Sequence, residues 1–152
     1  MQQNDTIADQ LRREQDAVNA LVRFFGEDHD FDRVIYTDWT AKDVFAHLVM
    51  WHESFAHIIL AIIQGEKPTL LPGLLHEINE NGVKEYKKYR IDELLKKMKT
   101  AQEIIERNIG SEKIGLIPYR KDSKRIYSRE KHLEIVCQHI TGHFAHILKK
   151  YT

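Results

Sequence analysis

Three histidines gather near the end of the chain, in the stretch QHITGHFAHI: His139, His143 and His146. Residues four apart lie on one face of a helix, so His139 and His143 can both reach a single cation. The chain holds nine histidines among 152 residues, and random placement of that many gives roughly half of one such pair. The spacing alone therefore leaves two interpretations open: a metal site, or half-buried boundary residues.

The helical wheel places these side chains at the edge of an apolar face. At about 100° per residue, His132, His139, His143 and His146 fall in one strip, roughly 110° from the centre of the apolar stripe. His47 lies about 100° from the middle of the apolar face of an earlier helix. When only the spacing and these edge positions are considered, the interpretation as half-buried, hydrogen-bonded histidines is favoured over a metal site.

Other polar residues could take part in chemistry, but each has a simpler role. Asp43 lies one turn before His47 and could orient its ring, yet Thr40 and Asp43 form a capping pattern, and we expect the capping role. His52 and Glu53 are acid–base candidates, although His52 lies near the apolar face. We expect packing roles for Trp51, Phe55, Asn79, Tyr86 and Tyr89, an inert buried thiol at Cys137, and no assigned partner for His29, His57, His76 and His132.

Long segments of helical period must position these residues. The first predicted helix runs from about Asp5 to Phe25, with Thr6 and Asp9 as a capping box. The second begins after Thr40 and ends before Gly65. The third region has a break near 90–92, and a last helix begins at Ser128. No stretch alternates like a strand, so we predict an all-α four-helix bundle, a single domain over residues 1–152, with a long crossover between the second and third helices.

Composition narrows the classes of partner. The 23 basic and 23 acidic side chains cancel, which argues against extensive nucleic-acid binding. The single cysteine cannot form an internal disulfide, and no hydrophobic signal segment opens the chain, so we expect a cytoplasmic protein. The most apolar run, FAHIILAII, is too short to span a membrane, and we expect no membrane association. A homodimer through an exposed helix face stays open as an alternative.

Two segments together resemble the DinB/YfiT-like superfamily. WTAKDVFAHLVMWHESF is similar to its second-helix signature, with Trp39 and Thr40 at the cap and His47 inside the helix. HITGHFAHI is similar to its last-helix H-x-x-x-H motif. The combination of Trp39-Thr40, Ala46-His47-Leu48 and Trp51-His52 most resembles the ClbS/DfsB branch. The resemblance implies a bundle with an up-down-down-up order of helices.

The resemblance also implies a metal site. One histidine of the second helix and two of the last would hold a divalent metal, zinc or nickel, and these match His47, His139 and His143. His146 matches a further histidine of some YfiT-like members and would support a ligand rather than bind. Zinc held by three imidazoles lowers the pKa of bound water to about 7, or stabilises a thiolate.

Two classes of function follow. The first is a metal-dependent enzyme, a hydrolase or a thiol S-transferase, acting on a small electrophilic or toxic molecule, with a low-molecular-weight thiol as a partner in the second case. The alternative is a metal-free protective protein of ClbS/DfsB type, which binds or hydrolyses a reactive metabolite with ordinary side chains. The sequence assigns no catalytic residue.

Overall fold

The computed structural model describes residues 6–121 and 123–152, so the predicted helix start at Asp5 lies outside the described residues. The described chain forms five helices and two short hairpins. The helices are α1 (Ile7–Gly26), α2 (Ala41–Ile63), α3 (Leu75–Tyr86), α4 (Ile91–Asn108) and α5 (Arg129–Lys149).

Local capping fixes where the long helices begin. Thr6 accepts a hydrogen bond from the backbone N–H of Asp9 at 3.1 Å, and the Asp9 carboxylate accepts one from Thr6. Thr40 and Asp43 form the same reciprocal pair at the start of α2, at 3.2 and 3.0 Å. Ser128 caps α5 by accepting from the N–H of Lys131. These starts confirm the sequence prediction, and Asp43 has the predicted capping role.

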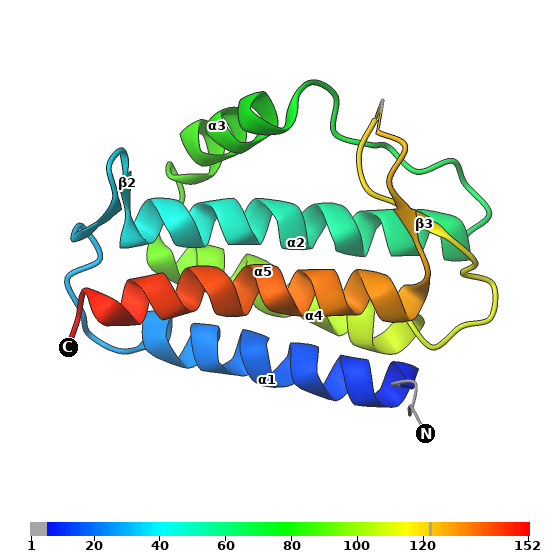
Figure 1. Cartoon of the computed structure of the whole chain (residues 1–152), viewed down its shortest axis with the longest axis horizontal. Helices are drawn as coiled ribbons and strands as arrows, with labels where there is room; N and C mark the ends of the chain where they lie inside the picture. Colours follow the sequence, from blue (N-terminus) through cyan, green and yellow to red (C-terminus); the bar gives the residue numbers. More distant parts are fainter. Residues whose placement is uncertain (1–5, 122) are drawn as a thin grey trace.

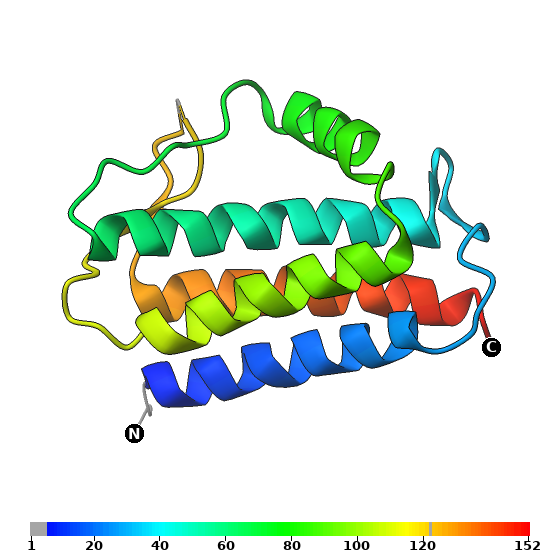
Figure 2. The ribbon, with the colours of Figure 1, turned by 180° about the vertical axis from the view of Figure 1, so that it is seen from behind.

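The four long helices form the predicted bundle. The chain colours in Figure 1 show that α1 and α5 run in one direction and that α2 and α4 run in the other. This is the up-down-down-up order. The chain passes from α2 to α4 through residues 64–74 and the short helix α3, which lies over α2 in both views (Figures 1 and 2). The predicted break near 90–92 separates α3 from α4.

Two hairpins stand at opposite ends of the bundle (Figure 1). β1 (Val34–Tyr36) pairs antiparallel with β2 (Trp39–Thr40), just before α2. β3 (Ile117–Pro118) pairs antiparallel with β4 (Ile126–Tyr127), just before α5. The sequence shows no sign of these strands, because strands of two or three residues are too short to show alternation. Each hairpin leads into one of the two helices that carry the candidate histidines.

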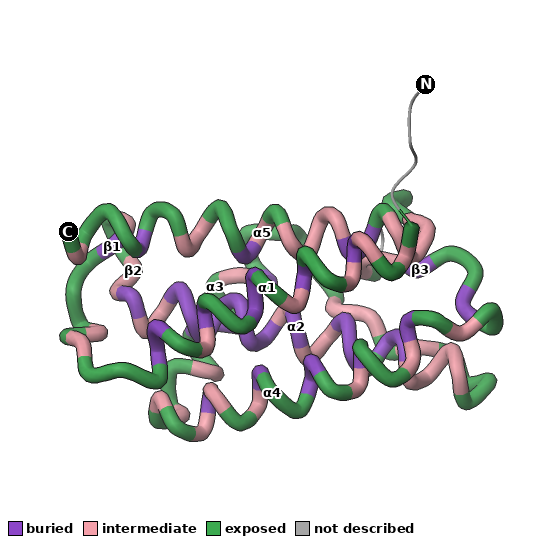
Figure 3. The backbone as a smooth tube through the Cα atoms, turned by 90° about the horizontal axis from the view of Figure 1, so that it is seen from below, coloured by how far each residue is buried: buried purple, intermediate pink, exposed green. Residues whose placement is uncertain are grey.

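The bundle core is built mainly around α2. Figure 3 shows buried positions along α1, α2 and α4, whereas α5 is mostly intermediate or exposed. Phe25 of α1 stacks on Phe45 of α2, with ring centroids 4.1 Å apart. Leu94, Met98 and Ile105 bring α4 into the same core with no exposed surface. α5 is therefore the helix with the most freedom to present side chains to a ligand.

α2 is also long and apolar enough to cross a membrane, judged by length and composition. In the bundle, however, 61% of its most apolar window is buried inside the protein. The central helix of a bundle core has the same apolar character, because it is covered by other helices on most sides. Burial in the core accounts for the composition of α2.

Candidate metal centre

The histidine rings of α2 and α5 meet between the two helices. Nε2 of His47 lies 3.0 Å from Nε2 of His139, and Nε2 of His139 lies 3.1 Å from Nε2 of His143. One ligand nitrogen from each ring fits within a span of 4.8 Å. The structure therefore brings together the three residues that the sequence resemblance singled out.

Two neighbouring elements hold this arrangement. The His139 and His143 rings project from successive turns of α5 and lie 4.8 Å apart between centroids. The His47 ring crosses both of them nearly at right angles. Trp39 of β2 packs against the His47 ring, with ring centroids 5.0 Å apart. The hairpin before α2 thus closes one side of the site.

The surroundings keep these rings neutral. Burial, and then the nearby His139 and His143, lower the pKa of His47 to about 2. Burial, and then His143, lower the pKa of His139 to about 4. Burial also lowers the pKa of His143. A metal ligand must be a deprotonated ring nitrogen, so this environment favours the ligand form at neutral pH.

Two of the three nitrogen separations suit a tetrahedral ion, and the set as a whole lies within 4.8 Å, so the widest pair would move closer together on binding one ion. Zinc binds imidazole at about 2.0–2.1 Å, which places two nitrogens of one tetrahedral site about 3.3 Å apart. The 3.0 and 3.1 Å separations lie close to that value. Neutral rings that face one another in this way can share at most one proton per contact, whereas one cation accepts all three lone pairs. The donor set therefore fits a divalent metal.

Tyr36 of β1 supports the site from the side of the hairpin. Its hydroxyl lies 2.8 Å from Nδ1 of His143 and 2.7 Å from Nδ1 of His146. If Nε2 of His143 carries the lone pair, its Nδ1–H donates to Tyr36, and the tyrosine O–H donates to His146. Sequence reasoning did not identify Tyr36, since no spacing rule links it to a helix more than a hundred residues later. His146 lies beside the cluster, as the resemblance implied.

The second nitrogen of His47 has no such support. Nδ1 of His47 is buried and has no hydrogen-bond partner among the described residues. Asp43, the candidate orienting residue, is engaged in the helix cap instead. Packing against Trp39 takes the place of a hydrogen bond in fixing this ring.

The remaining acid–base candidates have structural partners. The His52 ring is buried, and its Nε2 lies 2.7 Å from Oε1 of Gln102, whose amide donates to Glu14. Tyr86 donates to Glu53 at 2.6 Å. The Trp51 indole donates to Asn79 at 2.8 Å. These pairs connect α1, α2, α3 and α4, and the sequence did not predict them because each joins distant segments.

The other histidines and the cysteine lie apart from the cluster. His29 stacks on Phe24 with centroids 4.3 Å apart, whereas His57 and His76 are exposed. Cys137 is half-buried rather than buried, and its thiol donates to the backbone carbonyl of Arg13 at 3.6 Å. Burial raises the pKa of this thiol, which agrees with the inert role predicted for it.

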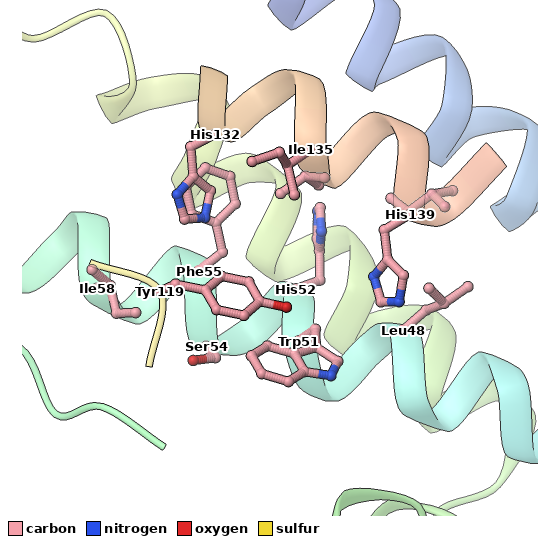
Figure 4. A pocket seen from close by; sticks show the side chains of 12 residues that line it. Leu48, Trp51, His52, Ser54, Phe55, Ile58, Tyr119, His132, Ile135 and His139 are labelled. Carbon is pink, nitrogen blue, oxygen red and sulfur yellow. The ribbon is translucent and has the colours of Figure 1, made fainter. Parts of the chain in front are cut away.

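A small cavity adjoins the histidine cluster between α2 and α5. It has a volume of about 50 Å³, and His139 is one of its twelve lining residues. Figure 4 shows His139 and His132 reaching from α5 towards α2, with Trp51 and Tyr119 across the opening. A small molecule held here would lie beside a proposed metal ligand.

Comparison with known proteins supports the fold. Neither a protein-family model nor a curated protein matches the sequence. A crystal structure of the mycothiol-dependent maleylpyruvate isomerase matches with a TM-score of 0.71 at 11% identity, over 91% of this chain and 59% of that one. A histidine-to-alanine variant of the same enzyme matches with a TM-score of 0.69 at 11% identity and the same coverage.

This likeness defines the class of fold. The chain is an all-α helical bundle with the same fold as that enzyme, as its sequence predicted. It spans 59% of the length of the enzyme that it matches.

Proposed function

We propose that this protein is a metal-dependent enzyme in which His47, His139 and His143 hold one divalent cation, zinc or nickel, and a low-molecular-weight thiol attacks a small electrophile. The observation that carries the proposal is the convergence of three neutral Nε2 atoms next to a cavity. A divalent cation held by neutral imidazoles keeps its full charge and acts as a Lewis acid that stabilises a thiolate.

The side chains of this protein orient the proposed ligands and give the cavity an apolar lining. In the metal-binding tautomer, Nδ1–H of His143 donates to Tyr36, which leaves Nε2 free to bind. Trp39 covers His47 on the side of the hairpin. Leu48 and Ile140 line the cavity and give it an apolar wall beside His139. In an addition to an α,β-unsaturated carbonyl compound, sulfur bonds to the β-carbon and the thiol proton ends on the α-carbon.

A thiol is preferred to water as the attacking group because of the structural likeness. The solved structures that share this fold are described as mycothiol-dependent, and our extension of thiol use to this chain is a proposal. Hydrolysis, in which water attacks and the same three histidines hold the metal, is the reaction to be distinguished from attack by a thiol.

The metal-free ClbS/DfsB-type alternative depends on the second-helix motif around Ala46, His47 and Leu48. In that alternative His47 would act without the α5 pair. The contact between His47 and His139 favours the metal-dependent proposal, since it joins the motif of α2 to the motif of α5.

Metal content and thiol chemistry together test the proposal. Protein purified without a histidine tag is analysed for zinc and nickel, and then assayed with cysteine and trans-2-hexenal for loss of free thiol. We expect near-stoichiometric metal and a catalysed loss of thiol, both abolished in His143→Ala and retained in His57→Ala. Thiol loss that survives chelation would favour the metal-free alternative, and metal content unchanged in His143→Ala would contradict the ligand set.

A further inference from the structure

The cavity beside the histidine cluster has a second histidine at its far end. His132 lies on the same side of α5 as His139, two helical turns earlier, which is about 10 Å along the helix axis. Both residues line the cavity, together with Phe55 and Val136. Figure 4 shows the two rings at opposite ends of the opening. A molecule in the cavity can therefore meet His132 at one end and the proposed metal centre at the other.

His132 is buried with an unmet hydrogen bond. Only 4% of the residue is exposed, and its ring stacks on Phe55 at 4.4 Å and 20°. Neither ring nitrogen of His132 has a hydrogen-bond partner in the described chain, and because Nδ1 is fully enclosed, Nε2 is the nitrogen that a molecule in the cavity can reach. An unpaired buried nitrogen costs free energy, which a ligand that bonds to it would recover.

Two other polar side chains of the lining already have hydrogen-bond partners. His52 is bonded to Gln102, and the Trp51 indole donates to Asn79. Tyr119 stacks on Trp51 with centroids 5.1 Å apart and forms an aromatic rim. His132, with the hydroxyls of Ser54 and Tyr119, is thus left to contact something that enters between the rim and the apolar wall of α5.

The cavity contains nothing that would balance a charge. None of its lining residues is Lys, Arg, Asp or Glu. Burial lowers the pKa of both His52 and His132 to about 4, so these rings are neutral. A carboxylate buried at the His132 end would lose its hydration without gaining a cation, because the proposed metal lies at the other end of the cavity. A carbonyl or hydroxyl oxygen would need only one hydrogen bond.

We propose that this cavity binds the uncharged end of the substrate, a small apolar group with one carbonyl or hydroxyl oxygen, and that His132 hydrogen-bonds to that oxygen. This inference rests on the proposed function, because that function makes the bound molecule a substrate and places the electrophile beside His139. The small volume limits the buried group to a few non-hydrogen atoms. Small uncharged aldehydes, ketones and esters meet these conditions, and dicarboxylates do not.

The test uses 2-butanone and propionate, which have the same shape and differ in charge. Both are titrated by NMR into isotope-labelled, metal-free full-length protein at pH 7, and the methyl signals of Ile135 and Val136 report on the cavity. We expect butanone to bind at least about tenfold more tightly than propionate. We expect His132→Leu to weaken butanone binding about three- to tenfold, and His132→Gln, which keeps a hydrogen-bonding group, to retain it.

Equal binding of the two probes by the natural protein would overturn the proposal, as would unweakened butanone binding by His132→Leu. The comparison of probes stands even if His132→Leu does not fold. Because the titration contains no metal, its result is independent of the metal analysis. A failed titration with intact metal binding would remove only the substrate class, and a successful one without metal binding would leave a ligand site and remove the proposed enzyme.

Discussion

The hydroxyl of Tyr36 lies 2.8 Å from Nδ1 of His143. This contact joins a three-residue strand before α2 to the middle of the last helix. Nδ1 is the nitrogen of His143 that faces away from the other two imidazoles, because Nε2 faces His139. The tyrosine therefore acts on the tautomer and orientation of a proposed ligand without approaching the cation itself.

Replacing Tyr36 by Phe removes this hydrogen bond and keeps the ring. Because orienting partners of ligand histidines typically contribute 10–100-fold to metal affinity, we expect Tyr36→Phe to weaken zinc binding by about 10–100-fold. Competition with a chromophoric chelator measures the change. Tyr89→Phe, a matched change at a ring that packs against Tyr86, serves as the control. Equal zinc affinity in both variants would show that the Tyr36 hydroxyl has no role in metal binding.

The proposed ligand set separates His47, His139 and His143, which would bind the metal, from the neighbouring His146, which would not. Alanine at His47, His139 or His143 should reduce bound metal from near-stoichiometric to background, because each change removes one of three lone pairs. His146→Ala should retain the metal, since its Nδ1 faces Tyr36 and not the cluster. Elemental analysis of the four proteins tests this pattern. If His146→Ala were the one variant of the four to lose its metal, the proposed ligand set would be wrong.

Glu14 should make the free energy of unfolding depend on pH. Burial raises the pKa of Glu14 to about 8, from 4.5. Between these values the folded state keeps a proton that the unfolded state releases, so stability falls as pH rises, by up to about tenfold in the unfolding equilibrium constant per pH unit. Urea unfolding between pH 6.5 and 8 with chelator should show this fall, and Glu14→Gln should abolish it.

Glu53→Gln is the control for that experiment, because it alters a glutamate outside the network of Glu14 and Gln102. A slope that persists in Glu14→Gln would mean that another group releases the proton. The histidines act in the opposite direction below pH 6.5. Their folded pKa values, about 4 for His52, His132 and His139, lie below the ordinary 6.5. Stability is therefore lost as pH falls from 6.5 towards 4, and it should be greatest near pH 6.5.

Gly142 lies between His139 and His143 of α5, where there is room for a side chain. A Cβ atom added there would have no heavy atom within 4 Å. Since glycine in a helix is less stable than alanine, Gly142→Ala should raise the free energy of unfolding by about 0.5–1 kcal/mol. At Gly82 the added atom would lie 2.6 Å from Cε of Met50, so Gly82→Ala should lack this gain. Urea unfolding measures both, and an unchanged Gly142→Ala would contradict the reasoning.

The helices could be predicted from sequence because their signals are local. Apolar residues at helical spacing and the pairs Thr6–Asp9 and Thr40–Asp43 lie within a few residues of the structure that they determine. The short hairpins could not be predicted, since two paired residues carry no periodic pattern.

The residues of the candidate site also divide into those that the sequence indicated and those that it could not. The spacing of His139 and His143 indicated that both can reach one cation, and the resemblance added His47 from a distant helix. Tyr36 and Gln102 had no such signal, because their contacts with His143 and His52 exist only in the folded chain. His132 was noticed as a histidine without a partner, and in the structure its Nδ1 is without one too.

Diffraction at the zinc and nickel absorption edges tests the central claim most directly. Crystals of untagged protein, grown without chelator, should give one strong anomalous peak within coordination distance of Nε2 of His47, His139 and His143. Three rings that remain in direct contact, with no peak between them in crystals soaked in zinc or nickel, would contradict the metal centre and the enzyme built on it.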